Sequence, residues 1–122
     1  MNDLREPLES IINALDGGAL AASIMGMDGL PVDAIELDSG DVDVSALLVE
    51  FSSLLNQVQK SAQMFAAGGL EELAIRSEHL TTIIRPITPD YLLCVAMRPD
   101  ANFGKGRYLL RINAPKLASA LA

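Results

Sequence analysis

Residues 44–65 form the longest amphipathic segment of the chain, with apolar side chains on one side and almost no charge on the other. The apolar residues recur at spacings of three and four, as on one face of an α-helix. They are Val44, Leu48, Phe51, Leu55, Val58, Ala62 and Phe65, with Leu47 and Leu54 widening the stripe. We therefore predict a helix whose apolar stripe lies on a core.

The opposite side of this helix, called the outer face below, lacks the charges typical of a solvated surface. It carries Ala46, Val49, Ser53, Gln57, Lys60 and Met64. Glu50 and Lys60 are the only charged residues in the segment. A surface helix this poor in charge indicates that another molecule covers the outer face.

The remaining pattern predicts two more helices and five strands. A first helix follows from the apolar spacing in residues 4–15, and Gly17-Gly18 ends it. A last helix is expected over residues 103–113, with Pro115 separating a short tail. The strands are expected at residues 20–25, 31–37, 70–76, 80–87 and 91–97, the first two joined by an Asp-Gly hairpin turn. The segment 91–97 is apolar throughout, as in a central strand covered on both faces.

The length of 122 residues fits a single domain over residues 1–122. No apolar run approaches the roughly 20 residues that span a bilayer, and the first residues lack an apolar signal sequence. The lone Cys94 lies in an apolar run, which is typical of a small buried side chain and fits a reducing cytoplasm. We expect a cytoplasmic protein that does not insert into membranes.

The net charge of −7 argues against nucleic acid as a partner. Residues 1–50 hold eleven acids and one base, whereas residues 76–122 hold seven bases and three acids. The simplest interpretation is that the two ends pack together and neutralise each other. The bases of the predicted last helix are accordingly expected to face Glu6 and Glu9, or solvent; they are Lys105, Arg107, Arg111 and Lys116.

The chain shows no pattern of residues that indicates catalysis, a metal or a cofactor. The only histidine, His79, lies beside Glu78 in a predicted turn, with no nucleophile paired to it. Gly104-Lys105-Gly106 lacks the first glycine and the hydroxyl residue of a phosphate-binding loop. A stretch of acids also lacks the spacing of a calcium loop: Glu36, Asp38, Asp41 and Asp43. An enzyme is not expected.

An open five-stranded sheet leaves two edges, and the third predicted strand offers a self-complementary one. If this strand pairs antiparallel with its twin about an axis near Ala74, Arg76 lies opposite Glu72 of the second copy. The long helix directly precedes the strand. We therefore predict a homodimer joined by the third strand and the outer face.

Three segments together resemble the roadblock / dynein light chain family: SIMGMDGLPVDAIEL, LLVEFSSLLNQVQKSAQMF and YLLCVAMRPDANFGKGRYLLRI. The similarity covers residues 4–114 and is nearest to the short prokaryotic, MglB-like members. It implies an α/β (α+β) fold, a profilin-like three-layer sandwich. In this fold a five-stranded antiparallel sheet carries one long helix on one face and two terminal helices on the other. It also implies dimers that share a continuous sheet through the third strand.

The resemblance further implies a non-catalytic homodimer that binds a small Ras-like GTPase and acts as a GTPase-activating protein or a scaffold. The docking residues would be Ala46, Val49, Glu50, Ser53, Gln57 and Lys60. Activation would position the switch loops of the GTPase; an arginine supplied by Arg98 or Arg107 is the alternative. A sensory or ligand-binding domain of the PAS or profilin type is a second interpretation. A cavity between the sheet and the terminal helices would favour it, and a packed core would favour partner binding.

Overall fold

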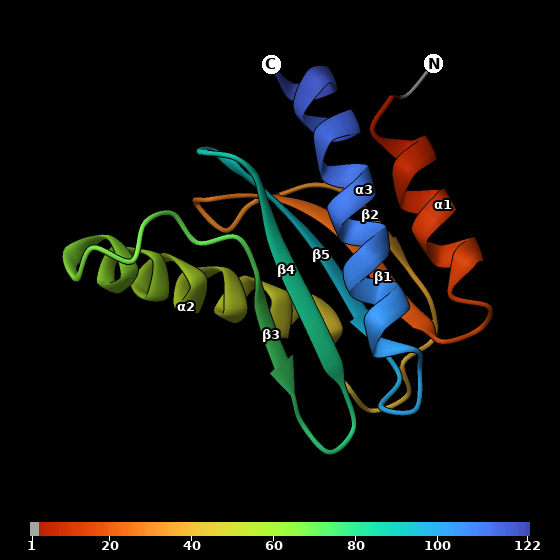
Figure 1. The fold of residues 1–122 in the computed structure, drawn as a ribbon. Coiled ribbons are helices and arrows are strands. Elements are labelled where there is room, and N and C mark those ends of the chain that lie inside the picture. Colours follow the sequence, from red (N-terminus) through yellow and green to blue (C-terminus); the bar gives the residue numbers. More distant parts are fainter. Residues whose placement is uncertain (1–2) are drawn as a thin grey trace.

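A five-stranded antiparallel sheet separates two layers of helices in the computed structural model, which describes residues 3–122 (Figure 1). The long helix lies on one face of the sheet, and the two terminal helices lie side by side on the other. The elements in chain order are α1 (Arg5–Ala14), β1 (Ala19–Gly26), β2 (Pro31–Glu36), α2 (Val44–Met64), β3 (Leu73–Arg76), β4 (Thr81–Thr88), β5 (Tyr91–Met97) and α3 (Phe103–Leu121). The predicted order of helices and strands is confirmed.

The strands lie in the order β2-β1-β5-β4-β3, so that β5 is central and β2 and β3 are the edges. Every residue of β5 after Tyr91 is buried, as the unbroken apolar run predicted. The turn between β1 and β2 is the expected hairpin. Asp28 Oδ1 accepts a hydrogen bond of 3.0 Å from the backbone N–H of Leu30, and Gly29 supplies a positive φ of 86°.

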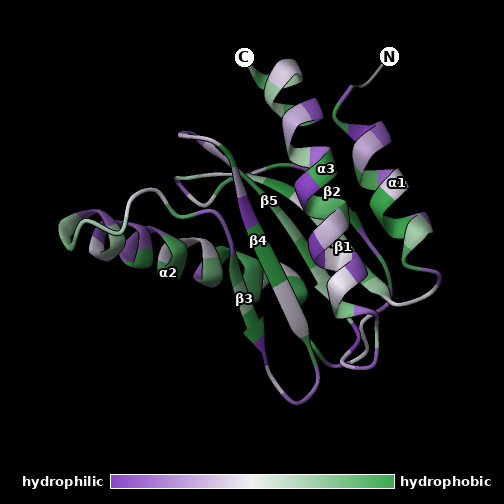
Figure 2. Ribbon diagram, in the orientation of Figure 1, coloured by the Kyte–Doolittle hydropathy of each residue, from purple (hydrophilic) through white to green (hydrophobic). Residues whose placement is uncertain are grey.

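Successive strand residues point to opposite faces and build two apolar cores. The strands of the sheet are largely hydrophobic along their length (Figure 2). Ile83, Leu93 and Val95 face α1 and α3, whereas Ile84 and Cys94 face α2. The core under the terminal helices is closed by Leu8, Ile11, Leu110 and Leu117, all with no exposed surface. Burying each such side chain is worth about 1.5–3 kcal/mol. The space between the sheet and the terminal helices is therefore filled by side chains.

The last helix is longer than predicted, because it continues through Pro115 to Leu121. A proline inside a helix removes the hydrogen bond to the carbonyl four residues earlier, which here belongs to Arg111. Both residues are exposed, so water can reach that carbonyl. Beyond the proline, Leu117 is completely buried against the core of α1. Burial of this side chain offsets the cost of the proline and extends the helix.

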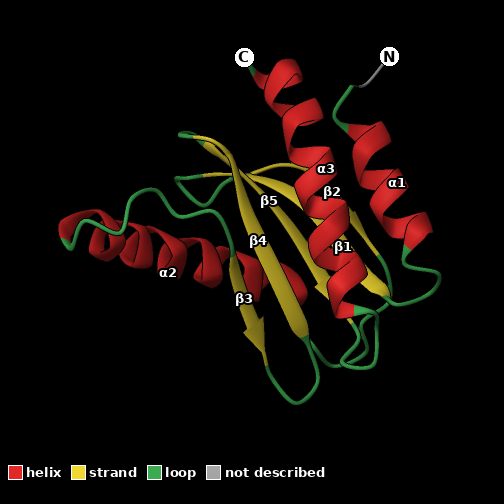
Figure 3. Ribbon diagram, viewed as in Figure 1, coloured by secondary structure: helices red, strands yellow, loops and turns green. Residues whose placement is uncertain are grey.

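The third strand is shorter than predicted and α2 ends earlier, so a loop of eight residues, 65–72, joins them (Figure 3). Gly68 and Gly69, which could have ended the helix, lie beyond its last residue, Met64. Ala66 ends the helix instead, with a positive φ of 63°, and the N–H of Ala67 donates to Ala62 O at 2.7 Å. An alanine in this left-handed conformation is strained by about 1 kcal/mol or more.

Replacing Ala66 with glycine should therefore raise the free energy of unfolding by up to about 1 kcal/mol, since relief of strain outweighs the added freedom of the unfolded chain. Urea denaturation measures this change. Ala67→Gly is the matched control, because the φ of Ala67 is not positive. If both variants are destabilised alike, the strain at Ala66 is not real.

Candidate interaction surface

Helix α2 extends beyond the sheet, past the β3 edge (Figure 1). Its buried residues, Val44, Leu48, Ser52 and Leu55, all lie in the first twelve positions. From residue 56 to residue 64 no side chain is fully buried. The N-terminal part of α2 is anchored on the sheet, with Asp43 as the N-cap accepting from Ala46 N at 3.1 Å. The C-terminal part has no sheet of its own chain beneath it.

The outer face is open to solvent along the whole helix. All of its residues are exposed, together with Glu50: Ala46, Val49, Ser53, Gln57, Lys60 and Met64. Val49 has 44% of its surface accessible and Met64 has 76%. No element of this chain within residues 3–122 covers the outer face.

Two residues assigned to the inner stripe are exposed, so that part of the prediction is wrong. Leu54 is 41% and Phe65 is 79% accessible. The spacing rule treats a helix as if a core ran under its full length, whereas α2 leaves the sheet after Leu55. Leu54, Met64 and Phe65 therefore add apolar area to the overhanging end.

The β1–β2 turn enlarges the surface beside the outer face, which the sequence did not reveal. A Cβ placed on Gly29 would lie 3.8 Å from Val49 Cγ1, and Asn56 Nδ2 donates to the carbonyl of Met27 at 2.9 Å. The exposed Leu30 projects from this turn. The one feature of the sequence that could have indicated this surface is the apolar side chain of Leu30 at the tip of a turn.

The β3 edge lies on the side of the sheet toward which α2 extends. β3 pairs with β4 on one side only, and Ala74 and Arg76 are exposed. Arg76 lies over the Phe103 ring of α3, with Cζ 5.0 Å from the centroid. Glu72, which precedes β3, accepts a hydrogen bond of 2.8 Å from Arg107 Nε, also on α3. Glu72 and Arg76 therefore share the face of the sheet that carries the terminal helices.

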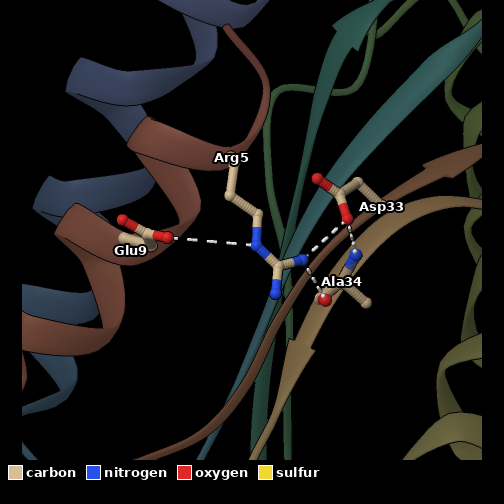
Figure 4. A network of polar contacts seen from close by, with 4 residues as sticks. All are labelled: Arg5, Glu9, Asp33 and Ala34. Carbon is tan, nitrogen blue, oxygen red and sulfur yellow. Dashed lines mark hydrogen bonds and ion pairs between the residues drawn. The ribbon is translucent and has the colours of Figure 1, made fainter. Parts of the chain in front are cut away.

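The charge distribution is arranged differently from the prediction. Arg5 of α1 binds acids within the N-terminal half, with Nη1 2.8 Å from Asp33 Oδ1 and Nε 4.0 Å from Glu9 Oε1 (Figure 4). Its Nη1 also donates to Ala34 O. Arg107 of α3 pairs with Glu72, not with the acids of α1. The expectation that the two ends neutralise each other through α1 and α3 is therefore wrong for Arg107 and Glu9.

The described residues offer little else that could carry chemistry. His79 Nε2 lies 3.7 Å from Glu78 Oε1, and both side chains are largely exposed. Burial raises the pKa of the Cys94 thiol to about 12, so this thiol stays protonated at neutral pH. Within residues 3–122 no three His, Cys, Asp or Glu side chains are grouped to hold a metal ion. In the same part of the chain, no helix combines the length and apolar character needed to cross a bilayer.

The fold and this surface define a class of protein, the profilin-like sandwich with one exposed long helix beside a free sheet edge. A family model of the Roadblock/LC7 domain matches residues 13–97. The chain therefore belongs to the Roadblock/LC7 family, as its sequence segments predicted. No curated protein matches the sequence.

Solved structures agree with this assignment. MglC from Myxococcus xanthus is 40% identical, with 98% of this chain and 99% of that chain covered and a TM-score of 0.70. Myxococcus xanthus MglB is 8% identical, with 99% and 96% covered and a TM-score of 0.84. Acanthamoeba castellanii profilin IA is 14% identical, with 96% and 98% covered and a TM-score of 0.58. The last two show the fold alone, and they confirm the predicted profilin-like, MglB-like architecture.

Proposed function

We propose that this chain is a non-catalytic homodimeric module that binds a small Ras-like GTPase and regulates it in the cytoplasm. The single observation that carries the proposal is the exposed outer face of α2, in a chain of the Roadblock/LC7 family. Helix α2 has only two charges in its 21 residues. Covering its exposed face with another polypeptide removes apolar surface from water and therefore lowers the free energy. The packed core under α1 and α3 favours partner binding over the alternative of a ligand-binding domain.

The dimer is proposed to form where β3 meets the overhanging part of α2. Pairing of β3 with its twin about Ala74 makes a continuous sheet of ten strands. The exposed Leu54, Met64 and Phe65 of each overhanging helix then lie over the partner's half of that sheet. Glu72 lies between Arg107 of its own chain and Arg76 of the second copy. Burial of this apolar surface drives association, and the charged pairs fix the register.

The register is tested by exchanging the charges. Arg76→Glu should weaken the dimer about tenfold, because two like-charged pairs arise across the two-fold axis. The double variant Glu72→Arg with Arg76→Glu, made in the Arg107→Gln background so that no like charge faces the new arginine, should recover most of the affinity of Arg107→Gln measured by sedimentation. Arg107→Gln is the control for the contact within one chain. If the double variant dimerises as weakly as Arg76→Glu, the proposed register is wrong.

The GTPase is proposed to dock on the accessible outer-face residues of the paired α2 helices, beside Leu30 of the β1–β2 turn. Regulation would act by positioning the switch loops and the attacking water, since phosphoryl transfer depends mainly on geometry and charge placement. The contacts of Arg98 and Arg107 do not support the alternative in which one of them is inserted into the GTPase site. Arg107 is held by Glu72, and Arg98 Nε donates to Gly17 O at 3.2 Å, at the end of the sheet near α1.

The test is a binding experiment with Ras-like GTPases encoded in the same genome, each loaded with a non-hydrolysable GTP analogue or with GDP. At least one GTPase should bind, with different affinity in the two nucleotide states. Phosphate release then separates the two roles, since an activator accelerates hydrolysis and a scaffold leaves it unchanged. Absence of binding in both states for all of them would overturn the proposal.

A further inference from the structure

Three arginines line a hollow on the face of the molecule opposite α2. The hollow has a volume of about 270 Å³ and lies where α3 crosses β4 and the start of β3. Its walls are Glu71, Glu72, Arg85, Gly104, Arg107, Tyr108 and Arg111. The first two come from the loop before β3, Arg85 from β4, and the rest from α3.

The positions of the arginines follow from the regular structure. Arg85 is two residues after Ile83 on β4, so its side chain emerges on the same face, toward α3. Arg107 and Arg111 are four residues apart on α3 and therefore lie one above the other. Three arginines, one from β4 and two from α3, therefore line the same hollow.

The walls of this hollow hold three arginines and two glutamates, so the chain balances its positive charge only in part. Arg107 is paired with Glu72, but Arg85 and Arg111 form no ion pair within residues 3–122. Arg111 instead lies over the Tyr108 ring, with Cζ 5.5 Å from the centroid. Arg76, beside the hollow, stacks on Phe103. Guanidinium groups arranged in this way retain donors that are free for a carboxylate or another anion.

We propose that this hollow binds an acidic peptide segment of a partner protein, whose carboxylates pair with Arg85 and Arg111. The half-exposed Tyr108 ring offers apolar contact to the same segment. Glu71 and Glu72 in the wall, and the net charge of −7, disfavour a long polyanion such as nucleic acid or an anionic membrane. A short peptide that carries both acids and hydrogen-bond donors fits arginines and glutamates together.

This site is separate from the surface proposed for the GTPase, because α2 and α3 lie on opposite faces of the sheet. Peptide binding can therefore fail while GTPase binding persists, and the reverse. In the proposed dimer, a two-fold axis perpendicular to the sheet would keep both hollows on one face. An acidic partner could then engage two copies, which would increase its apparent affinity.

The test uses the full chain and a fluorescein-labelled peptide of alternating glutamate and glycine, with an alternating glutamine and glycine peptide as the reference. Fluorescence anisotropy should show binding of the glutamate peptide that weakens with added salt, and at least tenfold weaker binding of the glutamine peptide. Arg85→Gln with Arg111→Gln should weaken glutamate-peptide binding about tenfold or more. Lys116→Gln, which removes one positive charge from α3 outside the hollow, should change it less than about twofold.

Amide chemical shifts of the unmodified protein keep the proposal falsifiable if the double variant does not fold. Addition of the glutamate peptide should shift Gly104, Tyr108 and Arg111, and leave α2 unchanged. If Lys116→Gln loses as much binding as the double variant, the loss depends on net charge and not on the hollow, and the proposal is overturned. So would stronger binding to phosphatidylserine vesicles or to single-stranded DNA, which would assign the hollow to another class of partner. Peptide shifts confined to other elements would also overturn it.

Discussion

Replacing Val49 with glutamate should abolish GTPase docking and leave the chain folded. The side chain is exposed in the single chain, so a carboxylate there meets water and costs the fold little. In the proposed complex with the GTPase the same carboxylate would be buried among apolar groups without a partner. That penalty amounts to several kcal/mol, which weakens GTPase binding at least about a hundredfold. The binding experiment with the GTPase measures the change, and circular dichroism verifies the fold.

The control is Ile112→Glu on α3. Ile112 is also an apolar side chain with an exposed surface, 36% accessible, but α3 lies on the opposite face of the sheet from α2. This variant should bind the GTPase as the unmodified chain does. If Val49→Glu and Ile112→Glu behave alike, the outer face of α2 has no special role.

The second large effect concerns the neighbouring pair Leu54 and Leu55 on α2. Leu55→Ala should lower the free energy of unfolding by about 2–5 kcal/mol, because the side chain is completely buried and one of few that anchor α2. Leu54→Ala should leave the fold within about 0.5 kcal/mol and weaken the dimer instead. Urea denaturation at a protein concentration too low for dimer formation measures the fold stability of both variants, and sedimentation velocity at higher concentration measures the dimer.

The two leucines are adjacent in sequence and chemically identical, so only their orientation on α2 separates them. A loss of fold stability at Leu54 as large as that at Leu55 would contradict the observed position of the helix on the sheet.

The architecture could be predicted from local patterns because each pattern has one physical solution. The period of the apolar residues in α2, the Asp28-Gly29 turn and the continuous apolar run of β5 each correspond to one element type and one environment. The exposure of Val49 follows from the same periodicity. These features depend on neighbours within a few residues, which the sequence states directly.

The errors arose where distant parts of the chain decide the outcome. Leu54 and Phe65 match the inner stripe, but whether a core lies beneath them depends on how α2 crosses the sheet. Proline usually ends a helix, so the sequence predicted an end before Pro115. Burial of Leu117 against α1 instead stabilises the helix beyond the proline. The pairing of Arg107 with Glu72, and the arginine hollow beside it, join segments separated by 35 residues. Rules based on the spacing of nearby residues cannot predict a contact over such a separation in sequence.

The most direct test of a shared assembly surface is a cysteine placed at Ala74. Two antiparallel strands related by an axis at this residue bring the two Cα atoms within about 4.5–5.5 Å, a distance that a disulfide spans. The native Cys94 is buried and its thiol stays protonated, so it does not compete. Mild oxidation of Ala74→Cys at micromolar concentration should yield a reducible species of twice the 13.0 kDa chain mass, while Val32→Cys yields none. An Ala74→Cys chain that remains uncross-linked and sediments as a monomer would contradict the account.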